Sequence, residues 1–460
     1  MSAASDILIL GLGRSGRAAA RYAAALAARG DAGSVTAVDG GDTDELRAEG
    51  EELERLGVSV MLGAEKVEGA YDLCVASPGI APETPIMRSA SRASARTISE
   101  IEFAFEHSSV PWIAITGTNG KTTTTALTCH LLQSAGIRAV AAGNIGLAAI
   151  AAVDLPDIEV LVAEVSSFQL ALTDRFHPHV AVLLNITPDH LNWHGTIEAY
   201  VEAKAKIFAN MSAEDFAVID VDDDGSAPYA DTLAGRDVGV ARVSLSRHFA
   251  GGATLVSGVL TLETAGGPVR LVPARDLAIR GPHNVSNALA AAAAAHFMGA
   301  SPMAIQSGLR SFRPLEHRLE PVATVRGVEW YNDSKATNPD AVYKALAAFD
   351  GQPLIVLLGG RNKGSDFSAL AREVTAKARA AVLFGEARGE LAEAFSGMPI
   401  RTLEAVGLAD AIELASNVAE SGDAVVLSPA CASFDEFDSY EQRGDVFRES
   451  VLARVEEGSQ

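Results

Sequence analysis

The chain has 460 residues, with 37 Lys plus Arg against 59 Asp plus Glu, which gives a formal net charge of −22. This length allows about three domains of ordinary size. The negative charge argues against a polyanionic partner such as DNA, RNA or an acidic membrane surface.

The cysteine content and the apolar runs indicate a compartment. Cys74, Cys129 and Cys431 are far apart and form no C-x-x-C pair, so neither a disulfide framework nor a zinc site is indicated. No apolar stretch reaches the ~18 residues of a membrane span, and no basic region precedes the first apolar run. We therefore expect a soluble protein of a reducing cytoplasm, without nucleic acid or membrane partners.

The first 40 residues are typical of a nucleotide-binding βαβ unit. The apolar run 7–10 is followed by Gly11-Leu12-Gly13-Arg14-Ser15-Gly16, a complete G-x-G-x-x-G, and then by an Ala-rich helix over 17–29. A second strand, 35–38, ends in Asp39, about where this fingerprint has its ribose-binding acid. The fingerprint indicates a diphosphate at a helix N-terminus but not whose it is. A nicotinamide-dependent dehydrogenase is therefore one interpretation.

A third strand, 71–76, leads into Ser77-Pro78-Gly79-Ile80. Open α/β sheets bind ligands at the carboxyl ends of their strands, although a plain connecting turn explains these residues equally well. We place a domain boundary near residue 99.

A glycine loop lies between a strand and a helix after this boundary. The apolar run 112–115 precedes Gly117-Thr118-Asn119-Gly120, and Lys121-Thr122 opens a segment with helical spacing. Backbone N–H groups of such a loop point at phosphate oxygens, Lys121 would reach the β/γ-phosphates and the Thr122 hydroxyl would hold Mg²⁺. Since Ile115 stands where the full pattern has glycine, we interpret the loop as a shortened phosphate loop. The alternative is a Gly-rich turn with a surface lysine.

Polar residues follow the next apolar strands. Gly143-Asn144-Ile145-Gly146, Glu164 after strand 160–163, Asn185 after strand 180–184, and Asp189-His190 should meet at one edge of a parallel sheet. Beside a triphosphate, Glu164 and His190 would be Mg²⁺ ligands or their supports. Without the loop, a structural role would be as probable for each.

The rest of the central region gives weaker signals. A helix over 199–209 carries Lys204 and Lys206, which by themselves indicate only solvated lysines. Residues 215–280 predict short strands with glycine turns. Asn284 and Asn287 stand at a long Ala-rich helix that begins near 287, where they would cap the helix or contact a base, capping being the default.

The last third predicts a second doubly wound α/β domain. Strands 328–331, 354–358, 381–384 and 424–427 alternate with helical segments, and the loops after them are rich in Gly, Asn and Ser. This region has no phosphate loop of its own. Two such domains on either side of a nucleotide domain suggest closure over substrates.

Six separated stretches, in order along the chain, resemble the Mur ligases of peptidoglycan precursor synthesis. They are Gly117–Thr122, Gly143–Gly146, Glu164–Leu170, Asp189–Leu191, His317-Arg318 and Asn332–Asn338. Within the family, 167–170, 333–338 and 427–437 are most similar to the members that add D-glutamate. The resemblance implies an α/β protein of three domains: a Rossmann-like UDP-sugar-binding domain over 1–99, a phosphate-loop ATP-binding domain with a mainly parallel sheet over 100–314, and a Rossmann-like amino-acid-binding domain over 315–460.

The resemblance also implies the site residues. Lys121, His190 and Lys204 match catalytic residues, and Lys204 matches a lysine that becomes carbamylated; the metal ligands would be Thr122, Glu164, His190 and Lys204. The residues implied for ATP are Gly117, Thr118, Asn119, Gly120, Lys121, Thr122, Thr123, Asn284, Asn287, Arg318 and Asp333. Those implied for the UDP-sugar are Arg14, Ser15, Asp39, Ser77, Gly79 and Asn144, and those for D-glutamate are Thr337, Lys363, Ser433 and Tyr440.

The implied activity is ATP- and Mg²⁺-dependent formation of an amide bond between UDP-N-acetylmuramoyl-L-alanine and D-glutamate through an acyl phosphate, by a monomer in the cytoplasm. A related ligase or a folylpolyglutamate synthase, with another amino acid, is the nearer alternative. The dehydrogenase remains a distant alternative, because it would leave the central motifs unexplained.

Overall fold

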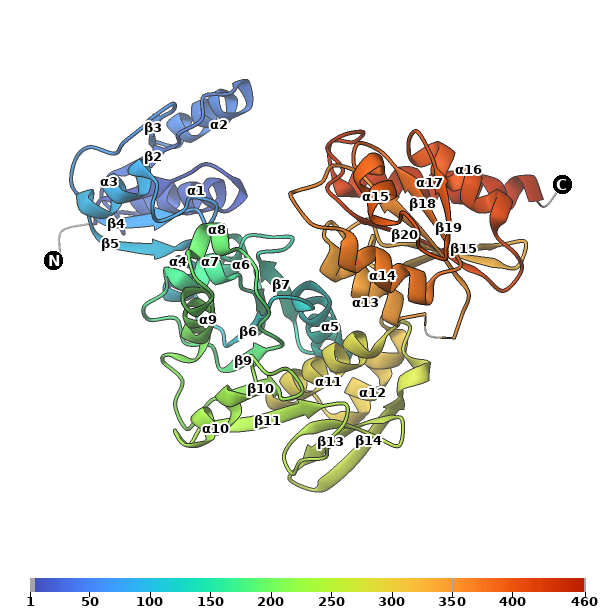
Figure 1. Ribbon diagram of the computed structural model, residues 1–460. Helices are drawn as coiled ribbons and strands as arrows, with labels where there is room; N and C mark the ends of the chain where they lie inside the picture. Colours follow the sequence, from blue (N-terminus) through green and yellow to red (C-terminus); the bar gives the residue numbers. More distant parts are fainter. Residues whose placement is uncertain (1–4, 350, 459–460) are drawn as a thin grey trace. The chain divides into compact units, whose positions relative to one another are not determined.

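The computed structural model describes residues 5–349 and 351–458. They form two compact units. Unit 1 comprises residues 1–275 and 286–311, and unit 2 comprises residues 276–285 and 312–460, each including only its described residues. Figure 1 labels the helices and strands of both units.

Unit 1 begins with a five-stranded parallel sheet in the order β3-β2-β1-β4-β5. Its strands are β1 (Ile7–Leu10), β2 (Val35–Val38), β3 (Ser59–Met61), β4 (Tyr71–Ala76) and β5 (Ser94–Ser99), and its helices are α1 (Arg14–Arg29), α2 (Asp44–Arg55) and α3 (Pro85–Ala93). The strand order reverses between β1 and β4. Such a switch point opens a crevice at the carboxyl ends of the two strands.

The fingerprint glycines let helix α1 start close to the sheet. A Cβ on Gly16 would overlap the backbone carbonyl oxygen of Gly11, so only glycine fits there. Along α1, the small side chains of Ala19, Ala20 and Ala23 are fully buried. The Ala-rich sequence therefore provides close helix–sheet packing.

The second sheet of unit 1 has nine strands, in the order β14-β13-β12-β11-β10-β9-β6-β8-β7. They are β6 (Trp112–Thr116), β7 (Ala139–Gly143), β8 (Val160–Glu164), β9 (Val180–Leu183), β10 (Phe216–Asp220), β11 (Gly239–Ser244), β12 (Ala253–Val256), β13 (Val259–Thr264) and β14 (Gly267–Pro273). In this sheet order, every neighbouring pair between β12 and β7, including those of β6, is parallel. The pairs β12–β13 and β13–β14 are antiparallel. Strand β6 is buried at all five residues and pairs with β8 and β9.

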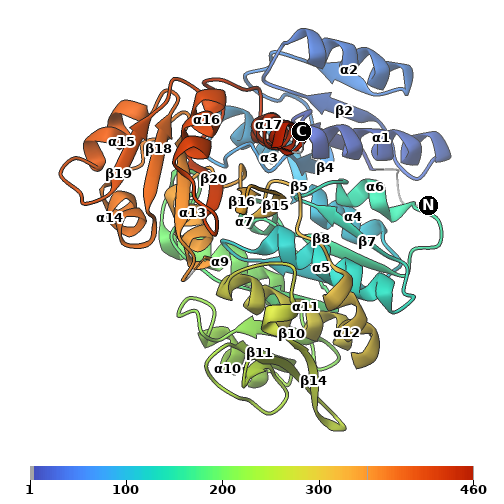
Figure 2. The ribbon, with the colours of Figure 1, turned by 90° about the vertical axis from the view of Figure 1, so that its right-hand side faces the viewer.

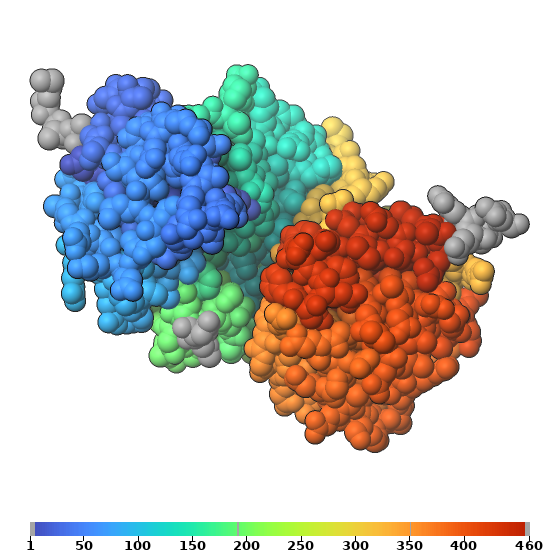
Figure 3. Space-filling view, turned by 90° about the horizontal axis from the view of Figure 1, so that it is seen from above, coloured from blue at the N-terminus to red at the C-terminus, as the bar shows by residue number. Residues whose placement is uncertain are grey.

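Short and long helices surround this sheet (Figure 1). They are α4 (Glu100–His107), α5 (Lys121–Ser134), α6 (Ala149–Val153), α7 (Ser167–Ala171), α8 (Leu191–His194), α9 (Ile197–Ala205), α10 (Pro228–Ala234), α11 (Pro282–Phe297) and α12 (Pro302–Ser311), with 3₁₀ turns at Lys206–Phe208 and Ala274–Asp276. Within unit 1 the blue and green parts of the chain adjoin in the space-filling view (Figure 3).

A buried carboxylate joins the two sheets of unit 1. The Glu102 side chain on α4 is fully buried and accepts hydrogen bonds from the backbone N–H groups of Asp174, Arg175 and Phe176 at 2.6–3.1 Å. Three donors to one carboxylate offset the cost of its burial.

Unit 2 contains a six-stranded sheet in the order β15-β16-β20-β17-β18-β19. The strands are β15 (Glu320–Val325), β16 (Val328–Asn332), β17 (Leu354–Gly359), β18 (Ala380–Phe384), β19 (Arg401–Glu404) and β20 (Ala424–Ala430); the helices are α13 (Pro339–Ala347), α14 (Ser368–Lys377), α15 (Arg388–Ala394), α16 (Leu408–Val418) and α17 (Tyr440–Gly458). Only the β15–β16 pair is antiparallel among the described pairings.

The apolar residues of β17 alternate between two core layers of unit 2. Leu354, Val356 and Leu358 pack with α13, α14 and α15, whereas Ile355 and Leu357 pack with α16 and α17. A continuous apolar run is therefore the expected sequence for a strand covered on both faces. Figure 2 shows this helix–sheet–helix layering.

The expected α/β fold with mainly parallel sheets is confirmed, whereas the division into three domains at 99/100 and 314/315 stays a prediction. Two expected boundaries differ from the observed ones. The helix expected over 199–209 runs from Ile197 to Ala205 and continues as a 3₁₀ turn, and the helix expected near Asn287 already begins at Pro282, because proline suits a first helical turn. Among the described residues, no helix is long and apolar enough to cross a bilayer.

Candidate functional site

The glycine loop lies at the carboxyl edge of the nine-stranded sheet, between β6 and α5. Its backbone is fixed from β9: Thr118 N–H donates to the Asn185 carbonyl at 2.9 Å, and Asn119 N–H donates to Asn185 Oδ1 at 2.8 Å. Thr118 Oγ1 also lies 2.9 Å from the Tyr200 hydroxyl. Asn185 therefore acts as a brace for the loop.

Gly120 has a backbone conformation and a surrounding that exclude other residues. Its φ is +85°, and a Cβ there would overlap the amide oxygen of Asn287. Lys121, Thr122 and Thr123 follow as the first residues of α5. The loop thus leads directly into a helix N-terminus, which favours phosphate groups.

Two lysines converge on one carbonyl oxygen of this loop. Lys121 Nζ donates to the carbonyls of Gly117 at 2.9 Å and Thr118 at 3.0 Å. Lys204 Nζ, from α9, donates to the same Gly117 carbonyl at 2.8 Å. Two lysine side chains thus meet at one phosphate-type loop of a strongly acidic chain.

Lys204 is an unusual lysine. Its side chain is 1% exposed and its Nζ lies 4.7 Å from the Tyr200 ring centroid. Burial, followed by the nearby Lys121 charge, lowers the pKa of Lys204 well below its ordinary value, while Asp189 and Glu164 oppose this shift. A lysine in this state is more readily neutral and nucleophilic than a solvated one.

Glu164 ends β8, the strand next to β6. It is 2% exposed; its Oε1 accepts a hydrogen bond from Asn144 Nδ2 at 2.9 Å, whereas its buried Oε2 has no hydrogen-bond partner among the described residues. An unsatisfied buried carboxylate oxygen is costly. A bound cation would satisfy it.

His190 lies beside aromatic side chains of the helices α7 and α9. Its ring centroid is 4.8 Å from that of Phe168 and 6.4 Å from that of Tyr200, and its φ is +53°. Burial lowers the pKa of His190, with further lowering by Lys121 and Lys204 against the opposing effect of Asp189. The imidazole is therefore favoured in its neutral form, the form that binds metals.

These groups fit a hard divalent cation that also binds substrate phosphates. The described residues contain no cluster of three or more His, Cys, Asp or Glu able to hold a metal. Mg²⁺ is usually held by one or two carboxylates with water and phosphate oxygens, and needs no dedicated protein cage. The unsatisfied oxygen of Glu164, near a phosphate-type loop, matches that mode.

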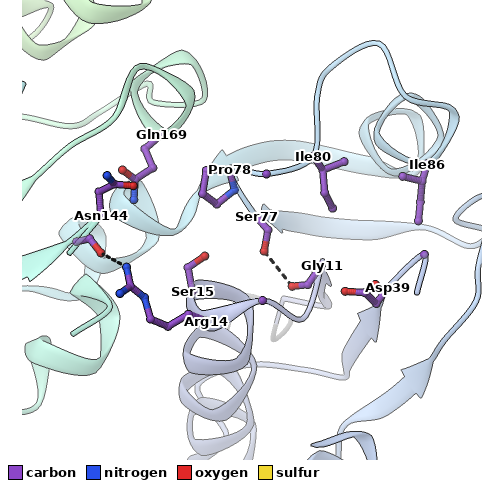
Figure 4. Close-up of a pocket in the computed structure, with 14 residues that line it drawn as sticks. Gly11, Arg14, Ser15, Asp39, Ser77, Pro78, Ile80, Ile86, Asn144 and Gln169 are labelled. Carbon is purple, nitrogen blue, oxygen red and sulfur yellow. Dashed lines mark hydrogen bonds between the residues drawn. The ribbon is translucent and has the colours of Figure 1, made fainter. Parts of the chain in front are cut away.

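A cavity of about 490 Å³ lies at the switch point of the five-stranded sheet (Figure 4). All six residues predicted for the UDP-sugar line it: Arg14, Ser15, Asp39, Ser77, Gly79 and Asn144. Arg14 Nη2 donates to the Gly143 carbonyl at 3.2 Å, and Asn144 in turn contacts Glu164. Asn144 therefore connects this cavity to the edge of the nine-stranded sheet at which the loop 117–120 lies.

Asp39 has a structural task as well as a place in the cavity. Its Oδ2 accepts from the Leu12 N–H at 2.6 Å and its Oδ1 from the Gly41 N–H at 2.7 Å. Ser77 Oγ donates to the Gly11 carbonyl at 3.0 Å. The Asp39 carboxylate and the Ser77 hydroxyl thus hold the loop after β1, residues 11–13, in shape.

Other residues at these two sites carried little signal in the sequence. The further cavity-lining residues are Gly11, Gly13, Gly40, Pro78, Ile80, Ile86, Gly143 and Gln169. The fingerprint, the 77–80 turn and the 164–170 motif include some of them, whereas Ile86 and Tyr200 could be placed only by the fold. His194, which lies 2.9 Å from Ser167 Oγ, was also missed.

In unit 2, three loops at neighbouring strand ends carry the residues predicted for D-glutamate. Lys363 Nζ, after β17, lies 3.4 Å from Thr337 Oγ1, after β16. Ser433, after β20, is 2% exposed. The Tyr440 ring lies at the start of α17 with Lys335 Nζ 3.6 Å from its centroid. Adjacent strands thus bring these loops to one edge of the sheet.

Asp333 is the most perturbed carboxyl group of this edge. It accepts hydrogen bonds from Ser428 Oγ at 2.8 Å and from the Leu319 N–H at 3.2 Å. Burial raises the pKa of Asp333 to about 7, although Ser428, Leu319 and Arg318 act in the opposite direction. Its charge state therefore changes near neutral pH.

The two asparagines of helix α11 differ in their surroundings. Asn287 contacts Gly120 within unit 1. Asn284 donates from Nδ2 to the Arg280 carbonyl at 2.7 Å within unit 2. Asn284 thus bonds to the backbone just before the helix.

Comparisons with known proteins match the whole chain. Residues 115–295 match the model of the Mur ligase middle domain, and residues 317–431 match that of the Mur ligase, glutamate ligase domain. The chain is 43% identical over 453 residues to a UDP-N-acetylmuramoylalanine--D-glutamate ligase of Pelotomaculum thermopropionicum, covering 97% of each chain. It is 41% identical over 452 residues to a protein of the same name from Geobacter metallireducens, also covering 97% of each.

Among solved structures, a pseudomurein peptide ligase type C from Methanothermus fervidus has the same fold. The TM-score is 0.61 at 19% identity, over 98% of this chain and 99% of that one.

A single methyl group at Gly120 should impair nucleotide binding. Gly120→Ala combines a left-handed backbone with overlap at Asn287, so we expect ATP affinity to fall at least about tenfold, measured by calorimetric titration. Gly136→Ala is the matched control, because Gly136 has φ +81° but open space around its Cβ position. Equal affinities of the two variants would contradict the assigned role of the loop.

The stability of unit 2 should depend on Asp333 near neutral pH. Because the folded-state pKa, about 7, lies above the unfolded value near 3.9, the contribution is complete below the unfolded pKa and lost as pH rises through 7. Asp333→Asn, in which the Ser428 hydroxyl can rotate to donate or accept, lacks this loss. We expect the urea midpoint of the variant to rise relative to the native chain between pH 6 and 8; parallel pH profiles would contradict this.

Proposed function

The chain belongs to the Mur ligase family, and from this premise we propose that it joins D-glutamate to UDP-N-acetylmuramoyl-L-alanine with ATP hydrolysis. The observation that carries the substrate assignment is the identity of about 40% over nearly the full length to two proteins named D-glutamate ligase. The two lysines at the Gly117 carbonyl support the class of reaction.

ATP would bind with its β- and γ-phosphates against the loop 117–120 and the N-terminus of α5. The Lys121 ammonium, which here donates to the carbonyls of Gly117 and Thr118, would turn to the phosphate oxygens, since charged acceptors form stronger hydrogen bonds. Asn287, which contacts Gly120, lies on the same side, and Asn284, Arg318 and Asp333 complete the proposed ATP residues.

The reaction proceeds in two steps. A carboxylate oxygen of the L-alanyl group attacks the γ-phosphorus, the bond to the β-phosphate oxygen breaks, and ADP leaves. The uncharged amine of D-glutamate then attacks the acyl carbon; the amine loses a proton, and inorganic phosphate leaves with the former carboxylate oxygen. Lys121 stabilises the charge that spreads over the γ-phosphoryl oxygens.

Thr122, Glu164, His190 and Lys204 are the residues that would hold Mg²⁺. When bound, the ion supplies charge neutralisation at the phosphate oxygens. The unsatisfied buried oxygen of Glu164 and the neutral state favoured for His190 support this assignment.

Lys204 would contribute as a carbamate, as the family resemblance implies. The lowered pKa of Lys204 favours the neutral amine, which adds to CO₂ with loss of a proton and becomes an anionic oxygen group. That change would replace a buried cation beside Lys121 with an anion. The repulsion between the two lysines would then become an attraction.

The cavity of Figure 4 would hold the UDP part of the acceptor substrate. Its walls comprise the start of α1 and a basic side chain, Arg14, which suits a diphosphate. Asn144, between this cavity and Glu164, would face the sugar portion that leads toward the reacting carboxylate. This use of the fingerprint leaves no support for the dehydrogenase alternative.

D-Glutamate would bind in unit 2 through Thr337, Lys363, Ser433 and Tyr440. Lys363 offers a cation for the side-chain carboxylate, and Thr337, at 3.4 Å from it, offers a hydroxyl. We further propose the three-domain division at 99/100 and 314/315, a monomer, and the cytoplasm as the place of this precursor synthesis, with Mg²⁺ as the metal.

Phosphate release tests the substrate assignment against the related ligases and folylpolyglutamate synthase. The chain is incubated with ATP, Mg²⁺ and UDP-N-acetylmuramoyl-L-alanine, alone or with D-glutamate, L-glutamate, L-lysine or meso-diaminopimelate. Release that requires D-glutamate supports the proposal. Release with only another amino acid keeps the ligase reaction but refutes the specificity.

Loss of the Lys121 ammonium should slow turnover strongly. Removing one preorganised charge partner from a transition state costs about 10²–10³ in rate, so we expect at least this decrease in kcat for Lys121→Ala in the same assay. Lys66→Ala is the control, since Lys66 is an exposed lysine of unit 1 whose ammonium group pairs with Glu68. Turnover of Lys121→Ala at the native rate would refute the phosphate-loop assignment.

A further inference from the structure

Another cavity, of about 390 Å³, lies in unit 2 at the opposite edge of its sheet from the loops that carry Thr337 and Ser433. The turn between β15 and β16 and the helices α16 and α17 form its walls. Its polar lining residues are Arg326, Trp330, Glu413, Ser416, Asn417 and Arg454. None of these residues has a role in the proposed ligase reaction.

Trp330 is the most buried of the polar residues that line this cavity. It is 2% exposed, and its buried indole N–H has no hydrogen-bond partner among the described residues. The surrounding core is apolar: Trp330 packs in one layer with Ile412 and Val451, and its ring lies 6.1 Å from that of Phe447. Buried indole N–H groups normally find an acceptor, so an unpartnered one in the lining of this cavity is an unusual feature of the core.

Two arginines make the same cavity basic. Arg326 is exposed at the β15–β16 turn, and Arg454 donates from Nη1 to the Ser450 carbonyl at 2.9 Å. Neither forms a salt bridge with a carboxylate in the described part of the chain, although most arginines of this acidic protein do. Among the described residues of the lining, Glu413 is the only carboxylate, so these residues together carry a formal charge of +1.

We propose that this cavity binds a small anion with a carboxylate or phosphate group. The two guanidinium groups would donate to its oxygens in the forked geometry that suits both groups. The side chains of Ser416 and Asn417 offer further donors, and Trp330 lies in the same lining. Glu413 restricts the site to ligands of low charge, or to those with an N–H or O–H group facing it.

Trp330 itself reports occupancy, because a charged group bound close to an indole ring changes its emission. The chain has three tryptophans, and Trp193 lies beside the proposed ATP site, where phosphate could also bind. The full-length Trp193→Phe variant is therefore titrated with inorganic phosphate or succinate at constant ionic strength. We expect a saturable change in emission at concentrations up to about 10 mM, and the more effective anion identifies phosphate or carboxylate as the preferred group.

The arginines give the decisive variants. In the same background, Arg326→Ala with Arg454→Ala should weaken binding at least about tenfold, the scale of a charged hydrogen bond. Arg401→Ala, at an exposed position of β19 in the same unit, should leave binding unchanged. The signal should also vanish in Trp193→Phe/Trp330→Phe.

Three results would overturn the proposal. They are no saturable change with either anion, a change that survives the double arginine substitution, and a change that survives loss of Trp330. If the Trp330→Phe variant does not fold, equilibrium dialysis with radiolabelled phosphate or succinate, with ATP and Mg²⁺ saturating the other site, compares the native chain with the double arginine variant. Equal binding by these two proteins refutes the site.

Discussion

The Gly117 carbonyl oxygen, to which both Lys121 and Lys204 donate, is the contact on which the candidate site depends. It holds two like charges together at a buried position, which is unfavourable unless one lysine is neutral or an anion intervenes. Burial, and after it the nearby Lys121 charge, lowers the pKa of Lys204. The loop, its Asn185 brace and the Tyr200 hydroxyl keep both lysines in place. The site is therefore built for anionic groups, as phosphoryl transfer requires.

Within unit 1, Asn144 and Glu164 connect the edges of the two sheets. Asn144 lines the UDP-type cavity and donates to Glu164, while Glu164 ends the strand beside the phosphate-type loop. A substrate bound in the cavity would thus extend toward the carboxylate that is proposed to hold the metal. The buried Glu102 carboxylate, with three backbone donors, stabilises the link between these sheets.

The sequence predicted the strand-end motifs well, because glycine loops after apolar runs have few alternatives. It placed Glu164, Asn144 and Lys121 at or after strand ends that meet at one edge of a parallel sheet, and the six UDP-sugar residues line one cavity. Only the family resemblance singled out Lys204. By its spacing this lysine looks solvated, yet it is 1% exposed, because burial depends on how α9 packs. The sequence could not predict the Trp330 cavity, since Arg326, Glu413 and Arg454 meet only after β15, α16 and α17 assemble.

The central claim is that a carboxylate of the acceptor attacks the γ-phosphorus at this loop. The most direct test uses UDP-N-acetylmuramoyl-L-alanine with ¹⁸O in the alanyl carboxylate, together with ATP, Mg²⁺ and D-glutamate, and measures the mass of the released phosphate. Our account predicts one ¹⁸O in each phosphate, because the acyl phosphate leaves its bridging oxygen with the phosphorus. Phosphate without ¹⁸O, formed alongside the amide product, would contradict it.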